Sequence, residues 1–270
     1  EEAIRSLARI YELKEGWVEL KGVFERQLQN AVGDDEEAEI RAKMARLAAD
    51  RLGNVSESGE GWKRVLDLRG EDPEARWALA DLYERQERWA ELTDVLERHF
   101  DIADSDEERV NILTRRANLF LERLGRDDDA LETWQRVLDI DFANVNALRA
   151  MAHIWRTRKD PQELVTVLHM TIDRAGPALE PRDLVEVYRE LGRTYADVLN
   201  QPYEAADAWR NLLEVDPSDL EAMDRLERGY RGEENWPAVV DIKIQRSSAL
   251  LDPSEKVREL LEVTEIWRTK

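Results

Sequence analysis

Side chains that could support catalysis are scarce in this sequence. Cysteine is absent, and histidine occurs only at His99, His153 and His169. None of these histidines lies at the spacing of a metal-binding pair, and there is no glycine-rich phosphate loop or serine nucleophile motif. The residue types and spacings therefore predict that the chain is not an enzyme and needs no cofactor. We expect His99, which lies beside Leu96 on a predicted helix, at a helix interface or on the surface.

Carboxylates are abundant, and two runs of them could be considered as calcium ligands, at residues 34–37 and 127–129. Neither run has the alternating spacing with a central glycine that a calcium-binding loop requires. Both runs precede predicted helices, where carboxylates are favoured by free backbone N–H groups and by the helix dipole. We interpret both as helix starts and predict no metal site.

Charge and composition exclude several classes of function. The 270 residues include 40 Lys and Arg against 60 Asp and Glu, a formal net charge of −20, which is a poor match to nucleic acids and to anionic membranes. No apolar run is long enough to insert into a membrane. Hydrophobic residues make up 42% of the chain, enough for a core, whereas only 12 Gly and 8 Pro argue against an all-β fold.

The two ends of the sequence suggest that it belongs to a longer protein. The chain begins without Met, shows no signal-peptide pattern and stops inside a predicted helix. We expect a cytoplasmic fragment of a larger protein.

Three series of residues recur with one period, which indicates internal repeats. Trp62, Trp134 and Trp209 open similar heptapeptides at spacings of 72 and 75 residues. A second series contains Trp17, Trp89, Leu164 and Trp236, and a third contains the tripeptides at 51–53, 123–125 and 198–200. Each period is long enough for two helical hairpins.

Helix signals divide the chain into hairpins with no need for strands. Asp72-Pro73 and Asp160-Pro161 each place an N-cap acceptor before a proline at the first helical position. Ser105 and Ser254 are followed by glutamates, which also favours helix starts. The predicted hairpins cover residues 1–33, 34–71, 72–104, 105–142, 143–177, 178–217 and 218–253, followed by a final helix at 254–268, all within a single domain.

The pattern within each hairpin resembles the tetratricopeptide repeat (TPR), a motif of paired helices A and B. Helix A signatures include Leu79-Ala80…Tyr83 and Leu191-Gly192…Tyr195, and helix B signatures include Ala130…Trp134 and Ala205…Trp209. The resemblance covers nearly the whole chain and implies an all-α, right-handed α-solenoid in which small residues let helices A and B approach closely. The array is similar to the long TPR arrays of bacterial scaffold proteins, whose role is protein–protein interaction.

Two departures from the TPR pattern alternate along the chain. In odd hairpins, the small residue of helix B is replaced by Leu20, Leu92, Leu164 or Val239, so these hairpins are expected to splay slightly or to shift register. Even hairpins carry one extra residue between helices A and B. Most tryptophans of the repeat series fall at core positions and are predicted to pack between helices.

The resemblance also implies which residues face the concave groove lined by the A helices. Seven of these sixteen positions are Arg and three are acidic, so they carry a charge of +4 in an acidic chain. The sixteen positions are Arg5, Arg9, Ala42, Arg46, Trp77, Asp81, Thr114, Asn118, Arg149, His153, Arg189, Arg193, Asp224, Arg228, Leu261 and Glu265. Asn111 and Arg156 lie on the same face. The candidate partner-binding residues are Trp77, Asn111, Asn118, Arg149, His153, Arg156, Arg189, Arg193 and Arg228.

Arginine forks bind carboxylates, and Asn amides can bind an extended peptide backbone, so these residues predict a groove for an acidic or extended segment of a protein partner. The alternative is that the arginines pair internally with acids such as Glu12, Asp50, Glu122, Glu186 and Asp197. The chain could also be a structural spacer that self-associates weakly through its ends or convex surface. Trp77 is either an interface anchor or a packing residue. Of three positions in the TPR two-carboxylate clamp, only Asn118 matches, so the clamp is not expected.

Overall fold

The structure is a computed structural model that describes residues 2–70 and 72–270, and the side chain of Arg5, one of the expected groove residues, lies outside its described part. The described residues form helices and contain no strand, as the all-α prediction requires. In chain order the helices are α1 (Glu2–Leu13), α2 (Trp17–Gln29), α3 (Asp34–Asp50), α4 (Val55–Arg69), α5 (Pro73–Arg85), α6 (Trp89–Ile102), α7 (Asp106–Leu119), η1 (Phe120–Leu124), α8 (Asp127–Ile140), α9 (Val145–Arg158), α10 (Pro161–Ala175), η2 (Gly176–Ala178), α11 (Pro181–Arg193), η3 (Thr194–Val198), α12 (Pro202–Val215), α13 (Leu220–Gly232), α14 (Trp236–Ala249) and α15 (Pro253–Thr269).

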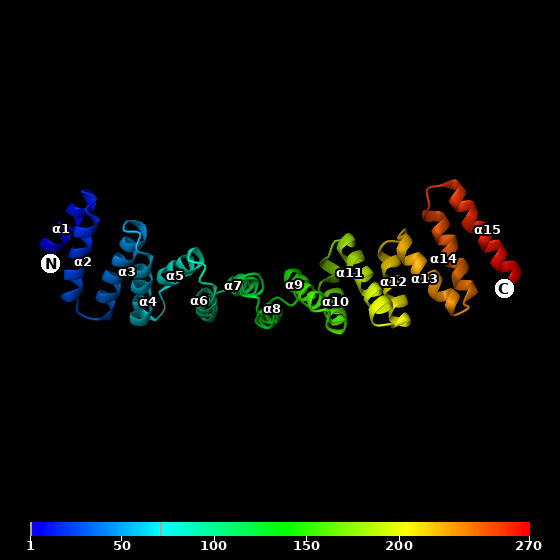
Figure 1. Cartoon of the computed structure of the whole chain (residues 1–270), viewed down its shortest axis with the longest axis horizontal. Helices are drawn as coiled ribbons and strands as arrows, with labels where there is room; N and C mark the ends of the chain where they lie inside the picture. The colour runs from blue at the N-terminus through cyan, green and yellow to red at the C-terminus, as the bar shows by residue number, and fades with distance from the viewer. Residues whose placement is uncertain (1, 71) are drawn as a thin grey trace. The chain divides into compact units, whose positions relative to one another are not determined.

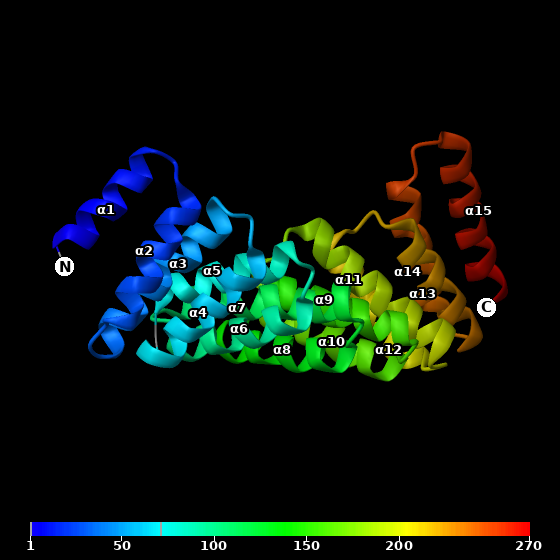
Figure 2. The ribbon, with the colours of Figure 1, turned by 60° about the vertical axis from the view of Figure 1, so that its left-hand side comes forward.

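The helices form two compact units whose boundary falls within α8, unit 1 at Glu1–Arg136 and unit 2 at Val137–Lys270. Within each unit, consecutive helices pack as antiparallel hairpins, and each hairpin packs on the next (Figures 1 and 2). This is the construction of an α-solenoid, in which a hairpin buries its apolar face only against its neighbours.

Local capping signals place the helix starts. Asp72 accepts a hydrogen bond from the backbone N–H of Ala75 at 3.0 Å, and Asp160 and Ser105 cap α10 and α7 in the same way. These three predictions are confirmed. The last helix differs from expectation, because it begins at Pro253 and its N-cap is Asp252, not Ser254. Asp252-Pro253 repeats the Asp-Pro signal at residues 72–73, and the cap carboxylate accepts from the N–H of Ser254 at 2.8 Å.

The extra residue of two even hairpins is absorbed by a π-helical turn at the end of helix A. These turns are η1, after α7, and η3, after α11. A π turn accommodates one inserted residue without ending the helix. The third residue of each repeated tripeptide then adopts a left-handed conformation, at Gly53 (φ 62°), Gly125 (φ 60°) and Asn200 (φ 54°). The tripeptide series therefore marks the reversal between helices A and B.

Side-chain size explains how the hairpins alternate. The even pairs α3/α4 and α11/α12 contact each other more extensively than the odd pairs α1/α2 and α5/α6, and the large residues Leu20, Leu92, Leu164 and Val239 are all buried in the odd hairpins. Gly192 on α11 lies directly against the indole of Trp209 on α12. The repeat tryptophans Trp62, Trp134 and Trp209 are core residues, as predicted.

Candidate functional site

Arginines of one helix A are paired with acids of an adjacent helix A in both units. In unit 1, Arg46 on α3 donates to both carboxylate oxygens of Glu74 on α5 at 2.5 and 2.6 Å, and Arg115 on α7 donates to Glu84 on α5 at 2.6 Å. These partners are separated by 28 and 31 residues, close to the length of one hairpin. The repeat period therefore places cations and anions of adjacent A helices opposite each other.

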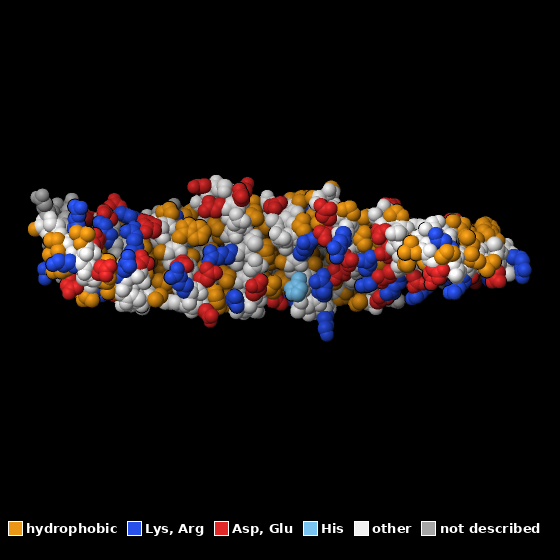
Figure 3. All heavy atoms as spheres, turned by 90° about the horizontal axis from the view of Figure 1, so that it is seen from above, with side chains coloured by type: hydrophobic (Ala, Val, Ile, Leu, Met, Phe, Trp, Pro, Cys, Tyr) orange, Lys and Arg blue, Asp and Glu red, His pale blue; other side chains and the backbone are white. Residues whose placement is uncertain are grey.

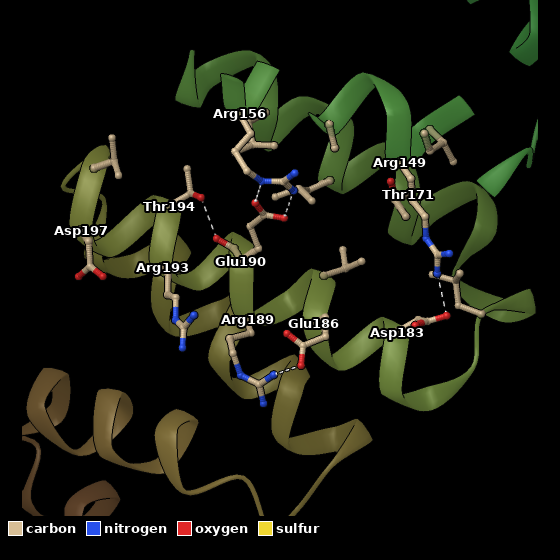
Figure 4. Close-up of a pocket in the computed structure, with 17 residues that line it drawn as sticks. Arg149, Arg156, Thr171, Asp183, Glu186, Arg189, Glu190, Arg193, Thr194 and Asp197 are labelled. Atoms are coloured by element: carbon tan, nitrogen blue, oxygen red, sulfur yellow. Dashed lines mark hydrogen bonds and ion pairs between the residues drawn. The ribbon is translucent and has the colours of Figure 1, made fainter. Parts of the chain in front are cut away.

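Unit 2 carries the most developed part of this network, in a cleft between α9, α10 and α11 (Figure 4). Arg149 on α9 donates to Asp183 on α11 at 2.8 Å. About two helical turns further along α9, Arg156 donates two hydrogen bonds, of 2.7 and 2.8 Å, to the carboxylate of Glu190. The cleft has a volume of about 780 Å³ and an apolar floor that includes Leu148, Leu164, Leu168, Leu179 and Val187.

On the far side of the cleft, α11 connects to α13 by the same kind of pairs. Arg193 donates to both oxygens of Glu221 at 2.8 and 2.6 Å. Arg189 donates to Asp219, the N-cap residue of α13, and to Glu186 on its own helix. The side chain of Arg189 is only 17% exposed, and its two partners link α11 to the start of α13. Arg149, Arg156 and Arg193, in contrast, are about half exposed, at 57%, 49% and 53%.

The ion pairs keep these groups charged. The hydrogen bond to Glu190 raises the pKa of Arg156 above its ordinary value, although burial opposes the shift. Glu221 raises the pKa of Arg193 in the same way. The hydrogen bond from Arg225 on α13 lowers the pKa of Asp197, at the end of the cleft. The cleft walls therefore carry fixed charges of both signs at neutral pH.

The charges that line the cleft balance. Four arginines (Arg149, Arg156, Arg189, Arg193) face four acids (Asp183, Glu186, Glu190, Asp197), so the net charge of the lining is zero. Figure 3 shows basic and acidic side chains interleaved on the face seen from above. The sixteen groove positions implied by the TPR resemblance carry a net positive charge because they include the A-helix arginines but not Asp183 and Glu190, which also line the cleft. Their signal in the sequence is an acid 34 residues after each arginine.

The nine candidate residues do not form one site. Four of them line the cleft of unit 2. Trp77 on α5 and Asn111 on α7 line a separate hollow of about 340 Å³ in unit 1. His153 is exposed on α9 and Asn118 is half-buried on α7, and neither lines these two hollows. Arg228 pairs with Asp224 on its own helix. Ala42, another of the expected groove positions, is buried.

Two of the acids named for the alternative of internal pairing do bind arginines. Glu186 pairs with Arg189, and Asp197 pairs with Arg225. Among the described residues, no cluster of three or more acidic or histidine side chains is arranged to hold a metal ion. Within that same part of the chain, no helix has both the length and the apolar character needed to cross a bilayer.

Comparisons with known proteins identify the repeat. Residues 78–110 match the sequence profile of a family described as tetratricopeptide repeat, which confirms the resemblance deduced from the helix signatures. No curated protein matches the chain. Among solved structures, a TPR protein from Parabacteroides merdae is 13% identical over 98% of both chains, with a TM-score of 0.40.

Two further solved structures are of the same kind. The C-terminal part of a TPR repeat-containing protein from Cytophaga hutchinsonii is 12% identical over 84% of this chain and 96% of its own, with a TM-score of 0.42. YrrB, titled a TPR protein with an unusual peptide-binding site, is 14% identical over 74% of this chain and 96% of its own, with a TM-score of 0.39.

Proposed function

We propose that this array of TPR hairpins is a non-catalytic protein–protein interaction scaffold, and that the cleft of unit 2 receives an extended, acidic segment of a partner protein. The observation that carries the proposal is the convergence of Arg149, Arg156, Arg189 and Arg193, from two successive A helices, above one apolar floor. The remaining candidate residues lie elsewhere and stay predictions.

Internal pairing of the arginines is compatible with binding. Exposed ion pairs contribute only about 0–1 kcal/mol each, and the guanidinium groups of Arg149 and Arg156 remain about half exposed. A partner carboxylate can therefore replace Asp183 or Glu190 at little cost and leave the displaced acid in water. Arg189 has a different role, because it is mostly buried and holds the N-cap of α13.

Apolar contact is also expected to contribute to the affinity. Leu179 and Val187 line the cleft as partly buried side chains, and Val198 at one end is 64% exposed. Burying apolar surface contributes about 25 cal/mol per Å². A segment that alternates apolar and acidic residues would cover these side chains and meet the arginines of the walls.

The test compares two kinds of variant that should act in opposite directions. The probe is a fluorescein-labelled extended peptide with alternating Glu and Leu, and its Gln counterpart is the uncharged control. In the triple variant Arg149→Gln, Arg156→Gln and Arg193→Gln, we expect the affinity for the acidic peptide to fall at least about tenfold. In Glu190→Gln, which frees Arg156, we expect the affinity to rise.

The matched control is Arg46→Gln, which removes a similar bidentate pair with Glu74 in unit 1 and should leave binding unchanged. If neither the triple variant nor Glu190→Gln changes the affinity while both remain folded, the cleft is not the binding site. Equal affinity for the Gln peptide would show that acidic residues are not what the cleft selects.

Exposed apolar side chains on α15 support the alternative of self-association. Val257, Leu261 and Trp267 are 56%, 59% and 69% exposed, on the helix at the right-hand end of Figure 1. Exposed apolar patches commonly mark contact surfaces. Sedimentation at increasing concentration should show assembly that Leu261→Glu abolishes, and a monomer at high concentration would exclude this alternative.

A further inference from the structure

Unit 1 contains a mostly buried arginine that has no counter-charge among the described residues. Arg76 on α5 is 6% exposed, and within the part of the chain that the structure describes it makes no hydrogen bond or ion pair. Arg46 and Arg115, on the neighbouring A helices, are both paired with carboxylates. Arginine is rarely buried in native proteins unless its charge is paired, and the guanidinium nitrogens of Arg76 are not among the fully buried atoms that lack a partner, so its charge remains accessible to a ligand. Arg76 therefore needs an explanation that the ion-pair network does not provide.

A second unsatisfied group lies beside this arginine. His99 on α6 is 5% exposed, and its Nε2 has no hydrogen-bond partner among the described residues. Burial, together with the charges of Arg76 and Arg115, lowers the pKa of His99 to about 4. The imidazole is therefore neutral at pH 7, and the positive charge beside it comes from Arg76.

Arg76 and His99 line one small hollow of about 160 Å³, whose wall includes Trp77. The indole of Trp77 is half exposed, lies 5.0 Å from the imidazole of His99 between ring centroids, and also lines the larger hollow of about 340 Å³. The arrangement combines the guanidinium of a mostly buried arginine, a neutral imidazole and an exposed aromatic surface. Such a combination can hold a carboxylate at its inner end and an aliphatic chain against the ring.

Two acids, Asp104 and Glu108, also line the small hollow. Both residues are exposed, and neither forms an ion pair with Arg76. The carboxylate of Glu108 instead accepts a hydrogen bond from the backbone N–H of Asp104 at 3.4 Å. These acids disfavour a dianion such as phosphate but leave a site for one negative charge.

We propose that Arg76, Trp77 and His99 form a pocket for a single carboxylate of a partner protein, in which Arg76 binds the carboxylate and Trp77 packs against the carbon chain that carries it. The carboxylate belongs either to an Asp or Glu side chain or to a chain terminus. This pocket lies wholly within unit 1 and is independent of the cleft proposed above.

Three peptide probes distinguish the sources of the carboxylate. The first is a fluorescein-labelled, C-terminally amidated peptide with one Glu, the second is the same peptide with Gln and a free C-terminus, and the third has Gln and an amidated terminus. We expect the third not to bind. Binding of the first or the second identifies a side chain or a terminus, respectively. Binding of the third as tightly as the others, or of none of them, would overturn the proposal.

Variants then locate the site. Arg76→Gln should weaken binding of the responsive probe by at least about tenfold, whereas the matched control Arg85→Gln, which removes an exposed arginine from the same helix, should not. The cleft variant Arg156→Gln should also leave this binding unchanged. In NMR spectra, the probe should shift the Trp77 indole signal and raise the pKa of His99, because the carboxylate offsets the charge of Arg76. Inorganic phosphate should not compete.

A stability measurement keeps the proposal testable without a ligand. If Arg76 is kept for binding, replacing this unpaired charge with Gln should leave the melting temperature unchanged or raise it. A clear loss of stability in Arg76→Gln, or unchanged probe affinity, would show that Arg76 serves the fold and not a ligand.

Discussion

The ammonium of Lys243 on α14 lies 2.9 Å from the carboxylate of Glu259 on α15, and the lysine side chain is only 2% exposed. The same ammonium is 2.7 Å from Glu262 and 3.3 Å from Glu227, which lies on α13. Arg246 joins this cluster through Glu227 and Glu259. The last three helices of unit 2 are therefore connected by a buried ion-pair network in addition to apolar packing.

This network predicts that acid loosens α15 before the rest of unit 2. Burial alone would raise the pKa of Glu227, but hydrogen bonding from Arg231 and the charges of Arg246 and Lys243 outweigh it and lower the pKa below the ordinary value of 4.5. The stabilisation is therefore complete above pH 4.5 and is lost as the pH falls through the folded pKa. Hydrogen exchange, corrected for intrinsic rates, should show loss of protection in α15 on acidification at a higher pH than in α12. Simultaneous loss in both helices would contradict the prediction.

Replacing the lysine should destabilise unit 2 at neutral pH. Hydrogen bonds to Glu262 and Glu259 overcome the effect of burial and raise the pKa of Lys243 above 10.5, so its contribution is present below that pH. Lys243→Met leaves buried carboxylates with fewer counter-charges and should lower the free energy of unfolding by about 3 kcal/mol. Arg258→Met, at an exposed position of α15, is the control and should change it by less than about 0.5 kcal/mol. Urea unfolding followed by circular dichroism measures both.

The sequence predicted the helices well because their signals are local. Asp72 and Asp160 indicate helix starts, because each caps a backbone N–H only three positions away. The burial of Leu79 and Ala80 is predicted by helical spacing alone. Asp252-Pro253 carries the same signal for a helix start, which the prediction of a last helix from residue 254 does not include. The reversal at residues 123–125 was visible as a repeated tripeptide, but the π turn before it depends on hydrogen bonds that no residue type specifies.

The candidate site was predicted only in part, because it depends on the distance between successive A helices. The positions of Arg149 and Arg156 followed from the pattern of one helix, whereas their pairing with Asp183 and Glu190 follows from stacking. Sequence spacing also gave no reason to connect Arg76 with His99, since the two lie on different helices and their lack of partners is a property of the folded packing.

Four non-glycine residues with positive φ offer a route to stabilisation. Each lies between the helices of an odd hairpin, and together they are Glu15, Glu87, Lys159 and Glu234, with φ between 54° and 56°. A left-handed conformation costs a residue with a Cβ roughly 1–2 kcal/mol, whereas glycine adopts it freely but loses more chain entropy on folding. Replacing all four with Gly should therefore raise the free energy of unfolding by about 2 kcal/mol, as measured by chemical unfolding.

The neighbouring residue Gln86 provides the control for this comparison. Gln86 has an ordinary backbone conformation, with φ −88°. Gln86→Gly therefore relieves no strain and should destabilise the protein by about 0.5 kcal/mol. If Glu87→Gly is no more stable than Gln86→Gly, the left-handed residues are not strained.

The two helical glycines Gly192 and Gly229 should respond to alanine with opposite signs. A Cβ added to Gly192 would lie 2.5 Å from the indole of Trp209, which is 2% exposed and cannot move aside. Gly192→Ala should therefore force α11 and α12 apart and cost about 2 kcal/mol. At Gly229 on α13 nothing lies within 4 Å of the added carbon, and Gly229→Ala should stabilise the protein by up to about 1 kcal/mol through helix propensity. Thermal and urea unfolding of the two variants measures the difference, and equal effects would mean that the close contact between Gly192 and Trp209 does not set the spacing of this hairpin.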